Sequence, residues 1–542
     1  MIAGQRPEPS RRTILKACAG WAVLGLAACG DGGAGKSAAS IATLNRGNGA
    51  EPESLDPPLA DTQWEQSILG DLMLGLFTED AEGKPIPGAA MEAAVSSDGL
   101  VWTFQLRDHR WSDGMPVTAG DFVYAWRRLL DPKTGSKFAA IAYPFKNAKA
   151  IAEGLAAPDT LGVRAEGDTT LVLELEHPAP YLRELVTHNI LYPVPRHVVE
   201  AKGAEWTQVR NYVSNGAYTL AERVPNGHIA LAKNPRFYDS ENVRIARVMF
   251  YPTEDAGAAL TRFRAGELDT QEPFPADQID WLRQNMPGAL KQVPTLSIDY
   301  IVLNIRRKPF DDARVREALN LALDRDTIAQ KIYRIGEQPA YNIVPPGIAN
   351  YPGGAAFAFK TLPYPERIAR AQELMRAAGY GPDRRLRTTF ATAALPDARR
   401  AAAAVQAMWQ TVYVDLDIVQ ADSAVTYSKL RQYDFDIGTA NWGADFNDAA
   451  NFLMLLTTGN PQNYAGYSNS AYDALYAAAE KEPDAGKRGA LLLQAEAIAL
   501  KDHAWITRNF RTSRVIVRPR VKGWIANARN FNRTRWLTLE NA

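Results

Sequence analysis

The sequence predicts a mixed α/β fold, because two short-range periodicities alternate along its 542 residues. Apolar residues at every second position predict half-buried strands, whereas apolar residues three or four positions apart predict amphipathic helices. Both patterns recur along the chain, and no short-period repeat is detectable. The fold class is therefore α/β.

The strand prediction depends mainly on two segments. Trp102, Phe104 and Leu106 are separated by single polar residues, and the stretch 171–175 has leucine at every second position. Such alternation is typical of a strand with one buried face. Strands are therefore expected at 102–106 and at 171–175.

The helix prediction is clearest after Asp311 and Asp312. Apolar residues follow at helical spacing over 315–323, and the acidic pair is placed where it can cap the first turn. Further helical patterns cover 365–378, 397–412, 472–480 and 488–501.

Length and charge limit the class of protein. A chain of 542 residues suggests about three domains. The 61 basic and 61 acidic residues balance, and removing residues 1–28 leaves a net charge of −3, which excludes the basic profile of a nucleic-acid-binding protein. The only cysteines, Cys18 and Cys29, lie in the N-terminal apolar segment, so we expect no disulfide within the body.

Residues 1–28 have the features of an export signal. Arg11 and Arg12 precede an apolar stretch, 17–28, that is too short for a permanent membrane helix and resembles the core of a signal peptide of the twin-arginine type. The sequence Leu-Ala-Ala-Cys ending at Cys29 resembles the bacterial lipobox, which predicts lipidation of Cys29; the alternative is an ordinary cleaved signal with a chance cysteine. The Gly-, Ala- and Ser-rich composition of residues 29–40 then predicts a flexible tether.

Residues 30–37 also match the P-loop pattern G-x-x-x-x-G-K-S. A P-loop binds phosphate only between a buried strand and a helix, whereas here the export signal precedes it and no helical pattern follows directly. The tether is the favoured interpretation.

No catalytic or metal-binding pattern is present in the body. The six histidines are scattered without the spacing of a helical metal site, and neither a Gly-x-Ser-x-Gly elbow nor a His-Glu-x-x-His motif occurs. We therefore expect no enzyme activity, no metal and no cofactor.

Several ordered motifs carry a family resemblance that covers nearly the whole body. Together they resemble the peptide- and nickel-binding family (family 5) of extracytoplasmic solute-binding proteins of ABC importers, and most closely its oligopeptide-binding members. The motifs are PESLDP at 52–57, VWTFQLR at 101–107, WSDG at 111–114, VTAGDFVY at 117–124, NGAY at 215–218, FRAGELD at 263–269, the stretch 310–326 and WGADFN at 442–447.

The resemblance implies a two-lobed type II periplasmic-binding-protein fold, also called a Venus flytrap, with an extra domain on the first lobe. Such lobes close over a ligand by a hinge motion. The expected ranges are 41–73, 196–297 and 514–542 for lobe I, 74–195 for the extra domain and 298–513 for lobe II.

The resemblance also implies capture of short peptides by a monomer and their delivery to the membrane permease of an ABC importer. Asp445 would pair with the α-ammonium group of the peptide, and the neighbouring backbone would bind the peptide like an added strand. Asp445 also fits a helix cap before Ala449, so both roles stay open. The expected ligand-binding residues are Asp445, Trp442 as an aromatic wall, Gly443, Asn441, Phe138, Gln63 and Ser423.

Four positions depart from the oligopeptide-binding pattern. Ser423, Leu430 and Thr439 stand where enteric members have a Trp and two Arg, and Phe138 replaces a Tyr that contacts ligand. The side-chain pockets and the capture of the C-terminal carboxylate are therefore expected to differ. Residues 306–308, Arg-Arg-Lys, are candidates for that carboxylate, with a solvated loop as the alternative.

Other functions stay open at this point. The same fold could bind a nickel chelate, haem, a cell-wall peptide or an opine-like compound. A lipid-anchored hydrolase of envelope peptides and a surface signalling receptor are alternatives from other classes. The location expected in each case is the periplasm or the outer face of a membrane.

Overall fold

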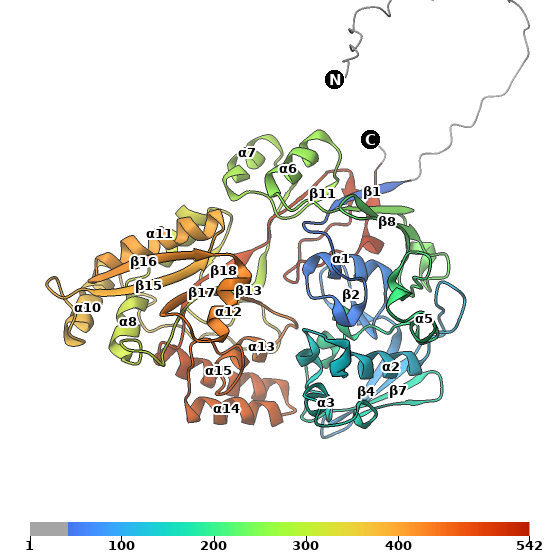
Figure 1. The fold of residues 1–542 in the computed structure, drawn as a ribbon, viewed down its shortest axis with the longest axis horizontal. Helices are drawn as coiled ribbons and strands as arrows, with labels where there is room; N and C mark the ends of the chain where they lie inside the picture. The colour runs from blue at the N-terminus through green and yellow to red at the C-terminus, as the bar shows by residue number, and fades with distance from the viewer. Residues whose placement is uncertain (1–41, 541–542) are drawn as a thin grey trace, which may run out of the picture. The chain divides into compact units, whose positions relative to one another are not determined.

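A computed structural model of the chain describes residues 42–540. The predicted export signal, Cys29, the tether and the P-loop-like stretch lie outside the described residues. The described part contains three larger sheets and two short sheets of two strands each (Figure 1). The short sheets pair β2 (Phe77–Glu79) with β3 (Pro85–Pro87) and β20 (Val521–Lys522) with β21 (Thr538–Leu539).

The first sheet has seven strands and mixes parallel with antiparallel pairs. Strand β1 is parallel to both of its neighbours, β10 and β11, and the remaining pairs are antiparallel. In spatial order the strands are β12 (Leu290–Lys291), β19 (Val515–Val517), β11 (Thr270–Gln271), β1 (Thr43–Gly47), β10 (Arg247–Tyr251), β9 (His228–Lys233) and β8 (Tyr218–Val224).

The second sheet has six strands, and its long strand β13 pairs antiparallel with a strand on each side. In spatial order the strands are β14 (Gln338–Pro339), β18 (Ile506–Thr512), β13 (Pro294–Leu303), β17 (Ile437–Gly443), β15 (Leu386–Ala393) and β16 (Val414–Ala421).

The third sheet is antiparallel and contains the two strands that the alternation predicted. Trp102, Phe104 and Leu106 are buried on one face of its second strand, as predicted. The strand beside it is also present, but Val172 is buried there along with Leu171 and Leu173, so both of its faces are covered. In spatial order the strands are β4 (Ala90–Val95), β5 (Val101–Leu106), β7 (Thr170–Glu174) and β6 (Val163–Glu166).

The helices predicted from apolar spacing are all present. Asp312 caps the helix that follows it, since its carboxylate accepts a hydrogen bond of 2.9 Å from the N–H of Arg314. The four further predictions correspond to α10, α11, α14 and α15, with ends that differ by up to three residues. The α-helices are α1 (Gln63–Leu72), α2 (Ala119–Leu130), α3 (Ala148–Ala152), α4 (Leu182–Leu185), α5 (Arg196–Lys202), α6 (Ala256–Ala265), α7 (Ile279–Asn285), α8 (Ala313–Leu321), α9 (Arg325–Thr327), α10 (Tyr364–Ala377), α11 (Pro396–Gln410), α12 (Ser423–Arg431), α13 (Ala450–Leu453), α14 (Ser470–Lys481) and α15 (Ala485–Lys501).

Two hydrophobic cores form around these elements. One combines buried residues of the seven- and four-stranded sheets, and the other surrounds the six-stranded sheet, where α11 packs along β15 and β16. Within residues 42–540, the chain passes between the two large sheets twice, at 292–293 and at 513–514. These two segments are hydrogen-bonded to each other, from the Ser513 N–H to the Val293 carbonyl at 2.9 Å.

The predicted domain ranges each hold one of the larger sheets, apart from β13, which begins four residues before the expected start of lobe II. The boundaries themselves stay predictions. None of the helices in the described part of the chain is long and apolar enough to span a membrane.

Candidate functional site

Two adjoining cavities lie where residues of both large sheets meet. The first, here called the Asp445 cavity, has a volume of about 460 Å³, and the second, the Asp299 cavity, of about 620 Å³. They share three lining residues, Pro273, Arg511 and Arg514, and are therefore neighbouring compartments of one cleft.

The walls of the Asp445 cavity come from both cores. Gln63 at the start of α1, Glu272 after β11 and Phe531 line it from the side of the seven-stranded sheet. Gly443 and Asp445 line it at the end of β17, on the side of the six-stranded sheet. A solute held here therefore contacts both sides at once.

Asp445 is held by its backbone, and its carboxylate is left almost unpaired. Its N–H donates to the Asn451 side-chain oxygen at 3.2 Å, and its carbonyl accepts from Arg529 at 3.2 Å. The carboxylate has only a hydrogen bond of 3.5 Å from the Asn451 amide. Burial is the main cause that raises the pKa of Asp445 to about 6, opposed by Asn451 and the charge of Arg529.

The alternative role of Asp445 as a helix cap is not what the structure shows. The first N–H of α13, that of Ala450, donates a hydrogen bond of 2.8 Å to the Asp448 carboxylate. Asp448 in turn pairs with buried Arg488 at 2.6 Å. The capping role therefore belongs to Asp448, and the carboxylate of Asp445 faces the cavity.

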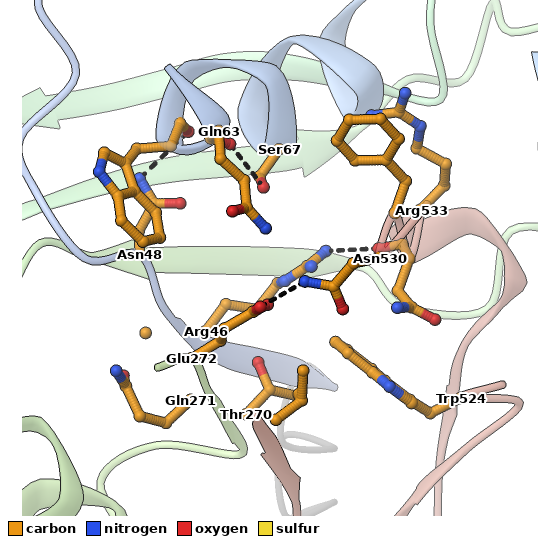
Figure 2. Close-up of a pocket in the computed structure, with 15 residues that line it drawn as sticks. Arg46, Asn48, Gln63, Ser67, Thr270, Gln271, Glu272, Trp524, Asn530 and Arg533 are labelled. Carbon is orange, nitrogen blue, oxygen red and sulfur yellow. Dashed lines mark hydrogen bonds between the residues drawn. The ribbon is translucent and has the colours of Figure 1, made fainter. Parts of the chain in front are cut away.

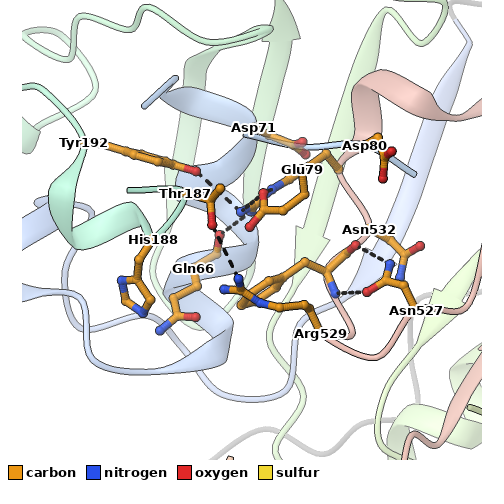
Figure 3. A network of polar contacts seen from close by, with 12 residues as sticks. Gln66, Asp71, Glu79, Asp80, Thr187, His188, Tyr192, Asn527, Arg529 and Asn532 are labelled. Atoms are coloured by element: carbon orange, nitrogen blue, oxygen red, sulfur yellow. Dashed lines mark hydrogen bonds and ion pairs between the residues drawn. The ribbon is translucent and has the colours of Figure 1, made fainter. Parts of the chain in front are cut away.

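Arg529 stays near Asp445 without neutralising it. Its guanidinium donates to the Thr187 hydroxyl at 3.4 Å (Figure 3). It also pairs with Glu184 at 3.5 Å. The remaining contact goes to the backbone carbonyl of Asp445 and not to its carboxylate. The negative charge of Asp445 is therefore available to a ligand.

The backbone of Gly443 forms an unpaired strand edge beside Asp445. The N–H of Asn441 donates to the Tyr427 hydroxyl at 3.1 Å, away from β13, whereas the N–H of Ala444 donates to a β13 carbonyl at 2.8 Å. Because these directions alternate along a strand, the N–H and C=O of Gly443 also point away from β13. On that side β15 pairs only with Ile437 and Gly438, so the edge at Gly443 is open.

The other predicted ligand residues are divided among several places. Asn441 and Ser423 line the Asp299 cavity, together with Thr439. Trp442 lies on the opposite side of β17, where its indole N–H donates to Asn451 at 2.8 Å, and it lines neither cavity. Phe138 packs against the core of the seven- and four-stranded sheets, outside both cavities.

The structure explains one departure from the family pattern. Leu430 is fully buried, and a Cβ at Gly438 would lie only 2.6 Å from its side chain. Leu430 is therefore a core residue. The candidate residues 306–308 line neither cavity; Arg306 stacks 4.4 Å from the ring of Tyr433, and Arg307 pairs with Asp436 at 3.5 Å.

Glu272 is a site residue that sequence reasoning missed. It also lines a smaller cavity, of about 30 Å³, where it accepts a hydrogen bond from the Asn530 amide (Figure 2). Burial raises the pKa of Glu272 to about 7, opposed by its hydrogen bonds from Asn530 and Gln63. Only its place directly after a short buried strand could have indicated this role.

Sequence reasoning also missed a group of arginines on β18. Asn509 opposes Asp299 and Thr507 opposes Tyr300, so Arg508 is the extra residue of a β-bulge. The bulge turns its side chain into the Asp299 cavity, where it pairs with Asp299 at 3.0 Å. Two further arginines of this cavity, Arg511 in β18 and Arg514 just after it, are three residues apart, which is not the period of a regular strand.

The chain is similar to known proteins in both sequence and fold. The family model described as "Bacterial extracellular solute-binding proteins, family 5 Middle" matches residues 84–464. The chain is 36% identical to the periplasmic murein peptide-binding protein MppA of Escherichia coli, over 88% of this chain and 89% of that protein. It is 35% identical to the periplasmic oligopeptide-binding protein OppA of Escherichia coli, over 91% of each. It is 34% identical to the probable deoxycholate-binding periplasmic protein YgiS of Escherichia coli, over 88% of this chain and 89% of that protein.

Solved structures show the same relationship. The structure of the Escherichia coli murein tripeptide-binding protein MppA has a TM-score of 0.82 and 34% identity, covering 92% of this chain and 99% of that chain. The crystal structure of Haemophilus influenzae OppA in complex with RPPGFSPFR has a TM-score of 0.80 and 32% identity, with the same coverage. The predicted two-lobed α/β fold of type II periplasmic binding proteins is thereby confirmed.

Proposed function

The chain belongs to family 5 of the bacterial extracellular solute-binding proteins, and from this premise we propose that it captures short peptides outside the cytoplasm and delivers them to an ABC importer. The observation that carries the proposal is the unpaired carboxylate of Asp445 beside the open strand edge at Gly443. These are the two groups that an extended peptide with a free amine requires.

The charge of Asp445 supports an amine-bearing ligand. A carboxylate held in a cavity without a cation is unfavourable, and an ammonium group would supply the missing charge and hydrogen bonds. The main-chain edge at Gly443 would bind the peptide as an added strand. Because backbone recognition does not depend on side-chain identity, we expect acceptance of varied peptides.

The two hydrogen-bonded crossing segments, 292–293 and 513–514, support a hinge between two lobes. We propose that lobe I comprises 41–73, 196–297 and 514–542 and carries the extra domain 74–195, with lobe II at 298–513. A ligand that contacts both lobes would favour the closed arrangement, and a permease would distinguish that arrangement from the empty one.

Export and membrane attachment are part of the same proposal. The relatives named as periplasmic support an exported protein, and Cys29 would carry the lipid that keeps a monomeric binding protein near its permease. Replacing Cys29→Ser should release the protein from the membrane fraction into the soluble extract, and labelling with a radioactive fatty acid should be lost. An unchanged membrane fraction would contradict lipidation at Cys29.

The experiment that tests peptide capture combines mass spectrometry with calorimetry. Denaturing mass spectrometry of the purified protein should release short peptides with free amines. In titrations, Asp445→Asn should bind Ala-Ala-Ala at least a hundredfold more weakly than the parent, about 2.7 kcal/mol. Asp417→Asn, which changes an exposed strand aspartate, is the matched control and should bind normally.

A ligand without an amine would overturn the proposal. One relative is named as probably deoxycholate-binding, and deoxycholate carries a carboxylate but no amine. Such a ligand would leave the Asp445 carboxylate without a charge partner, because it offers no ammonium group. Recovery of a bile acid, or equal affinity of Asp445→Asn for amine-bearing peptides, would contradict peptide capture through Asp445.

A further inference from the structure

Arg511 is the arginine of the cleft whose charge the protein leaves least satisfied. It lies one residue before the end of β18 and lines both the Asp445 cavity and the Asp299 cavity. Its side chain is 44% exposed, and its single ion pair within residues 42–540 is a long one of 3.9 Å, to Asp299. No hydrogen bond from its guanidinium to another described residue is present, although this group has five N–H donors.

The other arginines of the Asp299 cavity are already paired. Arg508 holds Asp299 at 3.0 Å. Arg514 pairs with Asp397 at 3.1 Å, and Arg400 also pairs with Asp397. Arg511 therefore differs from these neighbours in having no carboxylate within hydrogen-bonding distance, since its pair with Asp299 is 3.9 Å long.

The charges around Arg511 do not balance at neutral pH. Asp299, which pairs closely with Arg508, also accepts a hydrogen bond of 3.1 Å from Asn509. Glu337 accepts from the same Asn509, and burial, with Asp299 as the next cause, raises the pKa of Glu337 to about 8. With Glu337 protonated, one carboxylate faces two guanidinium groups, so one positive charge is in excess.

We propose that Arg511 binds a carboxylate of the ligand, so that the protein selects zwitterionic solutes with an amine at Asp445 and a carboxylate at Arg511. This inference rests on the proposed peptide capture and names the ligand chemistry of the same cleft. A bidentate guanidinium–carboxylate pair would use the free donors and neutralise the excess charge.

The strand register places both groups within reach of one ligand. Gly443 opposes Ser297 on β13, and β18 pairs with the other side of β13 around Arg511. The β17 and β18 backbones are thus two strand spacings apart, roughly 10 Å. A short peptide spans this distance because an extended residue covers about 3.4 Å.

The carboxylate has two possible sources, the C-terminus of a peptide or an acidic side chain. Titration calorimetry with three ligands separates them: Ala-Ala-Ala with a free C-terminus, Ala-Ala-Ala amide, and Ala-Ala-Glu amide, whose only carboxylate is on the side chain. The variants are Arg511→Gln, which removes the charge, and Arg511→Lys, which keeps it. Arg400→Gln is the matched control, because it changes a paired arginine of the same cavity.

The parent protein should bind at least one carboxylate-bearing ligand tenfold or more tightly than Ala-Ala-Ala amide, about 1.4 kcal/mol. Preference for Ala-Ala-Ala assigns the C-terminus, and preference for Ala-Ala-Glu amide assigns a side chain. In Arg511→Gln the preference should disappear while the affinity for the amide stays within twofold. Arg511→Lys should retain part of the preference, and Arg400→Gln all of it.

Two results would overturn the role of Arg511. One is a parent protein that binds all three ligands equally; the other is a preference that persists in Arg511→Gln. Both leave peptide capture intact, whereas failure of all three ligands to bind would contradict the proposed function itself. Melting temperatures of the variants show whether each one is folded, and Arg511 is exposed enough for its replacement to leave the core unchanged.

Discussion

The charged network around Arg533 differs from the cavity wall around Arg511 in how its hydrogen-bonding groups are used. Arg533 is almost fully buried and donates to the Glu79 carboxylate at 3.1 Å and to the Gln66 carbonyl at 3.1 Å. A further contact, of 3.5 Å, goes to the Tyr192 hydroxyl. Figure 3 shows these three partners of Arg533, which are Glu79, Gln66 and Tyr192. Arg511 makes no comparable contact.

The difference indicates which charges serve the fold and which serve a ligand. A buried ion that donates several hydrogen bonds, as Arg533 does, stabilises one arrangement of its neighbours. Asp445 and Arg511 instead stand on the walls of a cavity with acceptors or donors free. For Asp445, whose carboxylate is largely buried, this costs stability in the empty protein. Four changes test this distinction.

The largest effect is expected from Arg533→Met. This change removes one partner of a buried pair and leaves the Glu79 carboxylate without its cation, which typically costs about 3–5 kcal/mol. Unfolding in urea should show a loss of that size. Arg511→Met should change the free energy of unfolding by less than about 0.5 kcal/mol, as surface replacements do; equal losses would remove the distinction.

The next effect is expected from Gly70→Ala in α1. Alanine is normally better than glycine in a helix by about 1 kcal/mol. Here a Cβ would lie 1.5 Å from the Arg533 guanidinium, so the pair with Glu79 must shift and we expect a loss of about 2 kcal/mol. Gly257→Ala is the control, since that glycine lies exposed in α6 and its new Cβ would meet only the Asp255 side chain, at 3.2 Å. The free energy of unfolding of Gly257→Ala should be no lower than that of the parent protein.

Asp445→Asn should stabilise the empty protein while it abolishes tight binding. Burial raises the pKa of Asp445 in the folded state, so its ionisation at pH 7 opposes folding, and removing the charge should add about 1–2 kcal/mol. The gain should shrink as the pH falls from 7 towards 4, because the parent Asp445 then takes up its proton. A destabilised variant at pH 7 would show that the carboxylate serves the fold.

The smallest effect is the pH dependence of peptide affinity. An ammonium group binds the ionised form of Asp445, whose pKa of about 6 in the empty protein means that binding below pH 6 must displace a proton. The affinity should therefore fall about tenfold between pH 7 and pH 5, as measured by calorimetry. Other ionisable groups line the same cavity: Glu272, His188, Arg511, Arg514 and Arg529.

Glu272 also titrates in this range, because burial raises its pKa to about 7. The variant Glu272→Gln removes the titration of Glu272. Its peptide affinity should still fall between pH 7 and pH 5, because Asp445 still takes up a proton. His188 stays neutral throughout, since burial lowers its pKa to about 3. An affinity that is constant from pH 7 to pH 5 in Glu272→Gln would contradict the role of Asp445.

Sequence reasoning reached the elements of the fold more completely than the site. Alternation at Trp102, Phe104 and Leu106 and helical spacing after Asp312 are local patterns, so they predicted β5 and α8 without any knowledge of their neighbours. Asp445 was found through a family resemblance, and its alternative as a cap could be rejected only when Asp448 was seen to cap α13. Trp442 and Phe138, expected in the cleft, line neither cavity.

The sequence by itself determined the α/β class and indicated residues 441–447 as a candidate site, because periodicity and motif are properties of adjacent residues. The tertiary structure decided which charges are free. Arg508 and Arg511 reach the same cavity because a bulge and an irregular register interrupt β18, and the pairing of Arg533 with Glu79 joins residues 454 positions apart. Whether a charged side chain has an ion-pair or hydrogen-bond partner depends on residues that folding brings together. These residues are distant in the sequence, so no local pattern predicts them.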